Sequence, residues 1–317
     1  MNQTDEDKIS SWLLESVIPS IGYLTLRDFM DFPETDPRVK AKFQEMKESG
    51  PIPAILSEQS SLGNWAHERS YYTPKYTSTH WSMLLMAELA ADKRDKSLHK
   101  GVEFMLTTTR KGLEKHLSIR GSDATCFYGN LLRYALHFGF EADGRIAQIK
   151  EFLVGEALEA DWRCPYNLDL PCAWGAARAL WGLALLSSEQ RGDKVEKTIQ
   201  KGVILLLDRF PLVEANYPTE GTVHPLWFRH NFPLFYQADI LFILRVLAEL
   251  GQLEHPQAQP ALEWLAKRRY KNGRLRGANP FRQRTWSVLA DAEETNRWVT
   301  LQAAILMKKA KNVKIPK

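Results

Sequence analysis

The chain repeats one structural unit four times, and this repetition constrains its fold more than any other feature. Each unit joins an apolar helical segment to an amphipathic one through a short break, and the units begin at residues 77, 123, 170 and 234. A partial fifth unit occupies residues 297–310, and residues 36–46 form an isolated amphipathic segment. Strand-like alternation is almost absent, so we predict an all-α fold.

The first helix of each unit is apolar on nearly every side, as in the sequences LWGLALL and ILFILRVL. Such a helix must be buried all round, whereas an amphipathic helix needs only one covered face. We therefore expect two layers, with the apolar helices inside and the amphipathic helices outside. An open solenoid also buries alternate helices, so the repeat alone does not decide whether the layers close into a ring.

Capping residues indicate where these helices begin and end. Asp95, Asp143 and Asp193 stand where a side chain would accept the first free N–H groups of a helix. Gly139 and Gly251 follow apolar helices and are expected to adopt the left-handed conformation that ends them.

Composition narrows the class of protein. The 317 residues are 44% hydrophobic and 25% charged, as in a soluble globular protein, and no apolar run approaches the roughly 20 residues of a membrane span. The acidic N-terminus does not resemble a targeting signal, so we expect a cytoplasmic protein. A net charge of +4 with scattered basic residues argues against nucleic acid as a partner. Three cysteines do not suggest a disulfide framework.

A short motif precedes the first full repeat. Gln59, Gly63 and Trp65 form the pattern Q-x-x-x-G-x-W, and weaker versions lie at 159–162 and 272–275. This pattern resembles the QW motif of the squalene–hopene cyclases and the related prenyltransferases, in which the Gln caps an outer helix, the Gly turns the chain and the Trp stacks under the next repeat. The resemblance implies a single-domain α/α toroid over residues 20–308, a closed barrel of about five to six helix pairs. Residues 1–19 would then be an N-terminal extension and 309–317 a basic tail.

The same resemblance suggests a function. It implies an enzyme that holds an apolar, isoprenoid-like small molecule in a central cavity lined by the N-terminal ends of the inner helices. Transfer, cyclisation and hydrolysis all fit such a cavity. A barrel that needs a second subunit, as prenyltransferase subunits do, is one alternative. A non-catalytic toroid that binds a ligand or partner is another.

Evenly spaced cysteines and a histidine suggest a metal site. His80, Cys126 and Cys172 stand 46 residues apart at the starts of successive inner helices, and Cys164 lies in the loop before the third. Together they would form a plausible ligand set for one zinc ion. Cys126 and Cys172 are also candidate nucleophiles, because a helix N-terminus favours a thiolate. The alternative is that these side chains pack in the core as small apolar groups.

The longest insertion between repeats and the starts of the inner helices supply the remaining candidates. His230 and Asp239, in and after the insertion, are candidate acid–base residues, since a carboxylate can orient a histidine that titrates near neutral pH. Aromatic rings that could line a binding cup, or simply pack, are Tyr76, Trp81, Trp174, Trp227 and Tyr236. Arg163 and Arg229 could pair with a diphosphate or carboxylate of a substrate, or could be solvated.

Overall fold

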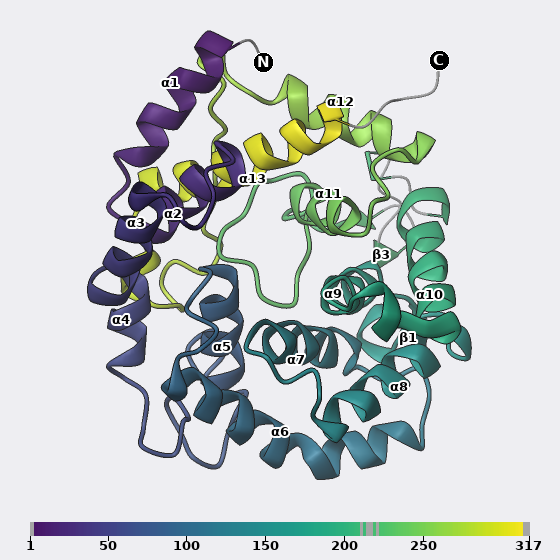
Figure 1. The fold of residues 1–317 in the computed structure, drawn as a ribbon. Helices are drawn as coiled ribbons and strands as arrows, with labels where there is room; N and C mark the ends of the chain where they lie inside the picture. The colour runs from purple at the N-terminus through teal and green to yellow at the C-terminus, as the bar shows by residue number, and fades with distance from the viewer. Residues whose placement is uncertain (1–2, 210–211, 214–217, 220–221, 313–317) are drawn as a thin grey trace.

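A computed structural model shows a mostly helical protein with little sheet, as predicted for an all-α fold, and describes residues 3–209, 212–213, 218–219 and 222–312 (Figure 1). The first helices are α1 (Gln3–Leu14), α2 (Pro19–Leu24), the π-helical turn η1 (Thr25–Phe29), α3 (Pro37–Glu48) and α4 (Pro51–Leu56). The repeats follow as α5 (Thr79–Glu88), α6 (Lys96–Leu117), α7 (Thr125–His137), α8 (Gly144–Leu158), α9 (Ala173–Leu183), α10 (Ser188–Ile204), the π-helical turn η3 (Leu205–Arg209), α11 (Ile240–Glu249), α12 (Gln259–Lys267) and α13 (Ala292–Asn312). Single 3-10 turns are η2 (Pro165–Asn167), η4 (Pro256–Ala258) and η5 (Ser287–Leu289).

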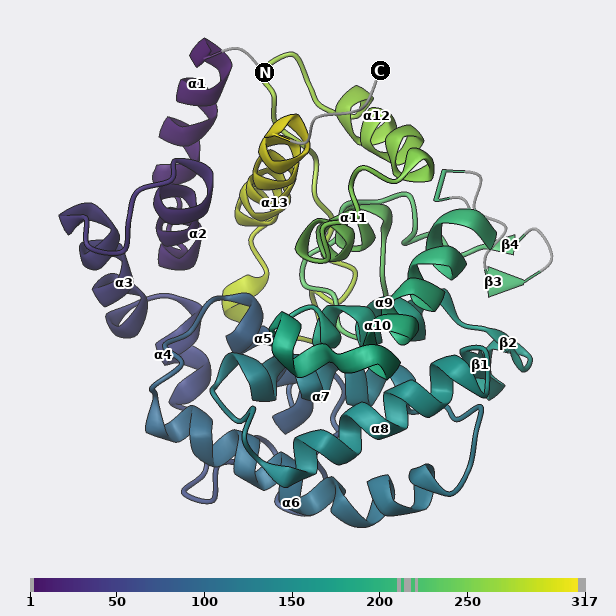
Figure 2. The same ribbon diagram turned by 45° about the vertical axis from the view of Figure 1, so that its right-hand side comes forward.

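The strands of the described residues are confined to two small hairpins. β1 (Arg163–Cys164) pairs antiparallel with β2 (Leu170–Pro171), and β3 (Pro218–Thr219) pairs antiparallel with β4 (Thr222–Val223). Figure 2 shows both hairpins on the same side of the molecule, beside α8 and α10. In the ranges given above, no helix is both long enough and apolar enough to cross a bilayer.

The helices lie in two layers around a common centre (Figure 1). In the inner layer α7 packs against α5 and α9, α9 against α11, α11 against α13, and α13 against α2 and η1. In the outer layer α6 packs against α8 and α8 against α10, while each outer helix also contacts its own inner partner. The inner helices α5, α9 and α11 are buried over most of their length, which is why their sequences lack a polar face.

The inner helices α7 and α9 approach each other closely. A Cβ atom at Gly129 would lie 2.6 Å from the backbone of Arg178 and Ala179, and one at Gly182 would lie 2.6 Å from the carbonyl oxygen of Gly129. Glycine is required at both positions because no side chain fits between the two backbones. This contact fixes how near the second and third inner helices come to each other.

The predicted caps are confirmed with one exception. The carboxylates of Asp95 and Asp143 accept N–H bonds at the starts of α6 and α8, and Gly139 and Gly251 have φ of 82° and 70°. Asp193 is not an N-cap. α10 begins earlier, at a capping box formed by Ser187 and Gln190, because the two side chains satisfy the free N–H groups reciprocally.

The Q-x-x-x-G-x-W segment ties the first repeat to its neighbours. The Gln59 side-chain amide donates to the carbonyl oxygens of Gly63 and Ser97, the latter in the first turn of α6, at 2.9 Å each. Gly63 has φ of 90° and lies against the backbone of Lys100. Trp65 is fully buried, and its indole N–H donates to the Ile55 carbonyl at 2.7 Å. The turning and packing roles implied by the motif are therefore present, whereas the cap of α6 is Asp95 and Gln59 ties the Gly63 turn to that helix.

The ends of the chain belong to the same helical body. Trp12 in α1, within the predicted N-terminal extension, donates to Glu293 at 3.1 Å and accepts at its carbonyl from Arg297 at 3.2 Å, so α1 packs on α13. α13 continues to Asn312, past the predicted boundary at 308, and Lys308 bonds to the Phe29 carbonyl at 2.6 Å. The rest of the predicted basic tail, 313–317, lies outside the described residues.

Candidate functional site

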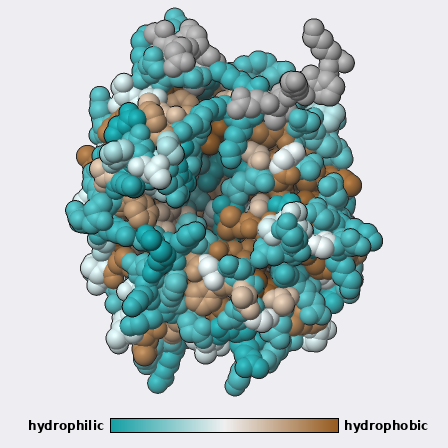
Figure 3. Space-filling model, in the orientation of Figure 1, coloured by the Kyte–Doolittle hydropathy of each residue, from teal (hydrophilic) through white to brown (hydrophobic). Residues whose placement is uncertain are grey.

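A cavity of about 610 Å³ opens at the centre of the inner helices, at their C-terminal ends. Figure 3 shows a hollow in this face, with apolar residues on part of its wall and hydrophilic residues around it. Its lining comes from α2, η1, α3, α5, α7, α9, α11 and α13 together. Its volume lies within the range of about 300–1,000 Å³ typical of small-molecule sites.

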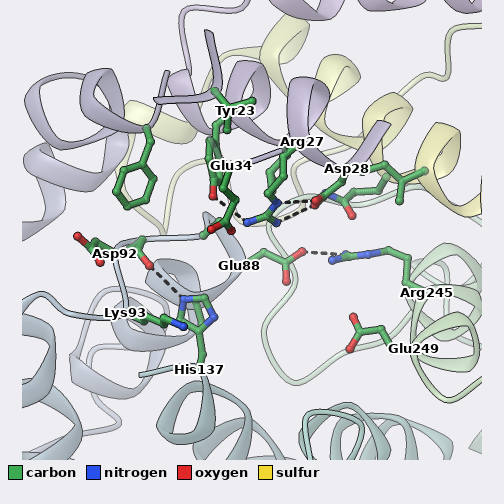
Figure 4. Close-up of a pocket in the computed structure, with 18 of the residues that line it drawn as sticks. Tyr23, Arg27, Asp28, Glu34, Glu88, Asp92, Lys93, His137, Arg245 and Glu249 are labelled. Carbon is green, nitrogen blue, oxygen red and sulfur yellow. Dashed lines mark hydrogen bonds and ion pairs between the residues drawn. The ribbon is translucent and has the colours of Figure 1, made fainter. Parts of the chain in front are cut away.

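Equivalent positions of the repeats supply the charged groups of the cavity. Arg133 and His137 precede Gly139 by six and two residues, and Arg245 and Glu249 precede Gly251 by the same intervals. Glu88 precedes Ala90, which has φ of 58°, by two residues. Residues four apart share a helix face. Each last turn therefore presents its polar side chains to the same side, toward the centre (Figure 4).

Two ion pairs join inner helices that are far apart in sequence. Arg245 in α11 contacts Glu88 in α5 at 2.8 Å, and their side chains are 19% and 13% exposed. Arg133 in α7 contacts Glu249 in α11, and it also donates to the Trp181 carbonyl at 3.0 Å. Burial is the largest influence on the pKa of Arg245 and acts to lower it, but the charge and hydrogen bond of Glu88, together with the charges of Glu249 and Asp239, raise the pKa overall. Arg245 thus remains charged at the floor of the cavity, and Arg133 lies beside it in an ion pair.

The π-helical turn η1 places a third arginine at the rim. Arg27 forms a two-point contact with Asp28 at 2.5 and 2.8 Å and donates to the Tyr23 hydroxyl at 2.9 Å. Figure 4 shows this group facing Glu88 and Arg245 across the cavity. Burial raises the pKa of Tyr23, so the phenol stays neutral.

His137 is a neutral histidine in a positive environment. Its Nε2 lies 3.1 Å from the Ala91 carbonyl oxygen, so Nε2 carries the proton. Burial lowers the pKa of His137 to about 4, and nearby basic groups, chiefly Arg133, act in the same direction. Nδ1 therefore keeps a free electron pair, and it has no hydrogen-bond partner among the residues that the structure describes. It can accept a hydrogen bond from a bound molecule.

A smaller cavity of about 20 Å³ shares Glu88 and Arg245 with the first and is also bordered by Arg178 and Asp239. Arg178 is fully buried and donates through Nε to the Gln237 carbonyl at 3.1 Å. Burial lowers the pKa of Arg178 to about 9 and raises that of Asp239 to about 6. The space is large enough for one water molecule between these groups.

The predicted zinc ligands do not form one set. His80 is buried, its ring stacks on Phe127 at 4.3 Å and its Nδ1 contacts the Tyr134 hydroxyl at 3.2 Å. Cys164 and Cys172 lie side by side near the β1–β2 hairpin, and none of the three cysteines is in a disulfide. Within the described ranges, no three His, Cys, Asp or Glu side chains are grouped so that they could hold a metal ion. The zinc site stays a prediction that this arrangement does not support.

The predicted aromatic cup is a packed cluster. Tyr76 lies 5.6 Å from Trp81, and Tyr236 lies 6.1 Å from both Trp81 and Trp174, measured between ring centres. Phe235 packs against both Tyr76 and Trp81, and the two cavities described above are lined by other residues. Trp227 is buried elsewhere and donates to the Leu212 carbonyl at 2.9 Å.

The remaining predicted residues are separate from one another. Asp239 caps α11 and accepts bonds from Asn231 and from the backbone N–H of Phe242, at 2.8–2.9 Å. His230 instead contacts the Arg276 carbonyl at 3.3 Å and packs on Trp264.

Asp239 and His230 therefore do not form an acid–base pair in this geometry. Arg163, which contacts Asp169 at 3.8 Å, and Arg229 are both exposed, and neither lines a cavity described here.

The resemblance implied a cavity at the N-terminal ends of the inner helices. The structure places the cavity at their C-terminal ends instead. The N-terminal ends are filled by the segment 226–239, which Asn130 holds through the Phe235 carbonyl at 2.9 Å and Arg178 through that of Gln237 (Figure 1). The residues missed in the sequence, such as Arg133, His137 and Arg245, carried a usable signal. They recur at fixed distances before the glycines that end the helices.

Comparisons with known proteins add no relative. The chain matches neither a protein-family model nor a curated protein sequence.

Proposed function

We propose that this chain is a closed α/α toroid that binds an amphiphilic, anionic small molecule in its central cavity. An isoprenoid diphosphate belongs to this ligand class. Ring closure is supported by the order of contacts from α5 through α7, α9, α11 and α13 to α2, and by the ion pair that links α11 back to α5. Both α2 and α5 line the cavity, as expected if the ring is complete.

The observation that carries the proposal is the excess of positive charge around a neutral histidine. Seven Lys or Arg and five Asp or Glu side chains line the cavity. Four of the five carboxylates, those of Asp28, Glu88, Asp92 and Glu249, already pair with basic groups. The surplus basic groups include Lys93 and Lys309, which are exposed to the cavity mouth. An anion is therefore favoured over a neutral or cationic ligand.

The apolar part of the lining suits the other half of an amphiphile. Leu24, Val39, Phe43, Ile305 and Leu306 all border the cavity. A hydrocarbon chain placed against them would be removed from water, at about 25 cal/mol per Å² of apolar surface. A phosphate or carboxylate at the same time would face the arginines and lysines, which bind such groups through charge-assisted hydrogen bonds.

Catalysis, if it accompanies binding, would fall to His137. Its Nδ1 is an acceptor held in place by the bond from Nε2 to Ala91, so it can accept a hydrogen bond from a substrate hydroxyl and orient it, although a pKa of about 4 makes it a weak general base at neutral pH. Acid-initiated cyclisation has less support, because the carboxylates of the floor, Glu88 and Glu249, are both paired with arginine side chains. This pairing favours the second candidate function, a non-catalytic carrier of the same ligand. Neither function requires zinc, and a second subunit stays a prediction.

Calorimetric titration of the native protein tests the proposal, with farnesyl diphosphate, farnesol and inorganic diphosphate as probes. We expect farnesyl diphosphate to bind at least about tenfold more tightly than either fragment, because only it engages both halves of the lining. The double variant Lys93→Gln/Lys309→Gln should weaken it by about tenfold or more, since a hydrogen bond to a charged group contributes about 1.5–3 kcal/mol.

Lys111→Gln/Lys115→Gln on outer helix α6 is the matched control and should bind like the parent protein. His137→Gln should retain binding and lose any turnover. Failure of farnesyl diphosphate to bind, or equal binding by the two lysine double variants, would refute the proposed site.

A further inference from the structure

Two cysteines meet at the β1–β2 hairpin, away from the central cavity. Cys164 lies in β1 opposite Leu170, and Cys172 follows β2, where its N–H donates to the Trp162 carbonyl at 2.8 Å. Side chains two residues apart on a strand share a face, so Cys172 is the diagonal neighbour of Cys164. The two thiols are joined by a hydrogen bond. Both side chains are partly exposed to solvent.

The two sulfur atoms have different surroundings. Cys172 is the N-cap of α9, and its Sγ accepts the backbone N–H of Gly175 at 3.3 Å. It therefore receives hydrogen bonds at the positive end of an 11-residue helix, an arrangement that favours a thiolate. The hydrogen bond with Cys172, followed by burial, raises the pKa of Cys164. Cys172 is thus suited to attack a disulfide as a thiolate. Cys164 is suited to remain protonated until it reacts in a second step.

We propose that Cys164 and Cys172 form a redox-active dithiol that a small-molecule disulfide oxidises to an intramolecular disulfide. In the first step the Cys172 thiolate attacks one sulfur of the small disulfide. A Cys172 mixed disulfide forms and one small thiolate leaves, taking up a proton. Cys164 then loses its proton and attacks the Cys172 sulfur, which releases the second small thiol. The protein loses two thiol hydrogens, and one small disulfide becomes two small thiols.

The third cysteine provides an internal control. Cys126, the second residue of α7, lies close enough to Cys164 for the two to affect each other's titration, yet burial raises the pKa of Cys126 to about 12. Its thiolate is therefore scarce at neutral pH, and its reaction with a disulfide should be slow. If Cys126 stays unmodified although it lies near the other two cysteines, the oxidation is specific to the Cys164–Cys172 dithiol and is not a general oxidation of all three.

The test exposes the full-length native protein to mixtures of reduced and oxidised glutathione. The reaction is quenched with acid, remaining thiols are alkylated, and cleaved peptides are analysed by mass spectrometry. We expect a Cys164–Cys172 disulfide in the parent protein and in Cys126→Ser. In Cys164→Ser, one glutathione should accumulate on Cys172, because the resolving thiol is gone. In Cys172→Ser, modification of Cys164 should be at least about tenfold slower.

Circular dichroism on each variant establishes that the helical fold is retained. The proposal is overturned if folded Cys126→Ser forms no disulfide under conditions in which the unfolded chain does. It is also overturned if Cys164 or Cys126 takes up glutathione as fast as Cys172. Because neither result depends on a ligand in the central cavity, the outcome is independent of the proposed function.

Discussion

Adding one methyl group between α7 and α9 should destabilise the protein although it improves local helix propensity. In Gly129→Ala the new Cβ would lie 2.6 Å from backbone atoms of Arg178 and Ala179, where about 3.4 Å or more is normal. Backbone atoms of a packed helix cannot rotate aside, so the two helices must move apart by several tenths of an ångström.

The size of the effect follows from two opposing contributions. Overpacking a core costs about 1–3 kcal/mol, and this site belongs at the upper end because the clash is with backbone along a closely packed helix pair. Replacing Gly by Ala in a helix interior contributes about 1 kcal/mol in the other direction. The net loss is about 2 kcal/mol, which for a chain of 317 residues corresponds to a fall in Tm of about 3 °C.

Gly112→Ala is the matched control. Gly112 lies inside α6, and an added Cβ there meets only the Tyr128 hydroxyl at an ordinary 3.5 Å. The same substitution should therefore raise stability by about 0.5–1 kcal/mol. Thermal unfolding followed by far-UV circular dichroism measures both. If Gly129→Ala proved as stable as Gly112→Ala, the close approach of α7 and α9 would be refuted.

Much of the fold could be predicted because the features that indicate it lie within short stretches of sequence. The all-α class, the helix pairs and the caps at Asp95 and Asp143 follow from periodicity and from free N–H groups that need an acceptor. The prediction at Asp193 is wrong because the capping box at Ser187 already begins the helix. Gly192, with φ of 54°, makes a kink inside α10, and the residue after this kink resembles a helix start when only the sequence is considered.

The position of the cavity could not be predicted, because it depends on contacts between distant segments. The segment 226–239 decides which ends of the inner helices stay open, because it fills the N-terminal ends. Asn130 in α7 and Arg178 in α9 hold this segment by hydrogen bonds to its backbone. Its aromatic residues suggest a binding cup in the sequence, yet they serve as packing. The equal spacing of His80, Cys126 and Cys172 likewise reflects the repeat, since within the described part of the chain these side chains do not converge on one site.

Two further predictions concern buried charge. Burial lowers the pKa of His80 to about 3 from the ordinary 6.5, so between these values the unfolded chain binds a proton that the folded chain does not. Stability should therefore fall as pH drops from 6.5 toward 3, by about 1.4 kcal/mol per unit from this group, and urea unfolding of His80→Phe should show a shallower pH dependence. An unchanged slope would contradict a neutral, buried His80. The ion pair across the ring gives the second prediction. Glu88→Gln should cost about 3–5 kcal/mol, because it leaves the charge of Arg245 buried and unpaired. Glu88→Gln/Arg245→Gln should recover part of that loss, whereas Glu114→Gln, which breaks an exposed pair with Arg110 on α6, should cost no more than about 0.5 kcal/mol. Equal losses for Glu88→Gln and Glu114→Gln in urea unfolding would mean that water reaches the floor of the cavity freely, and that the link from α11 to α5 does not hold the ring together.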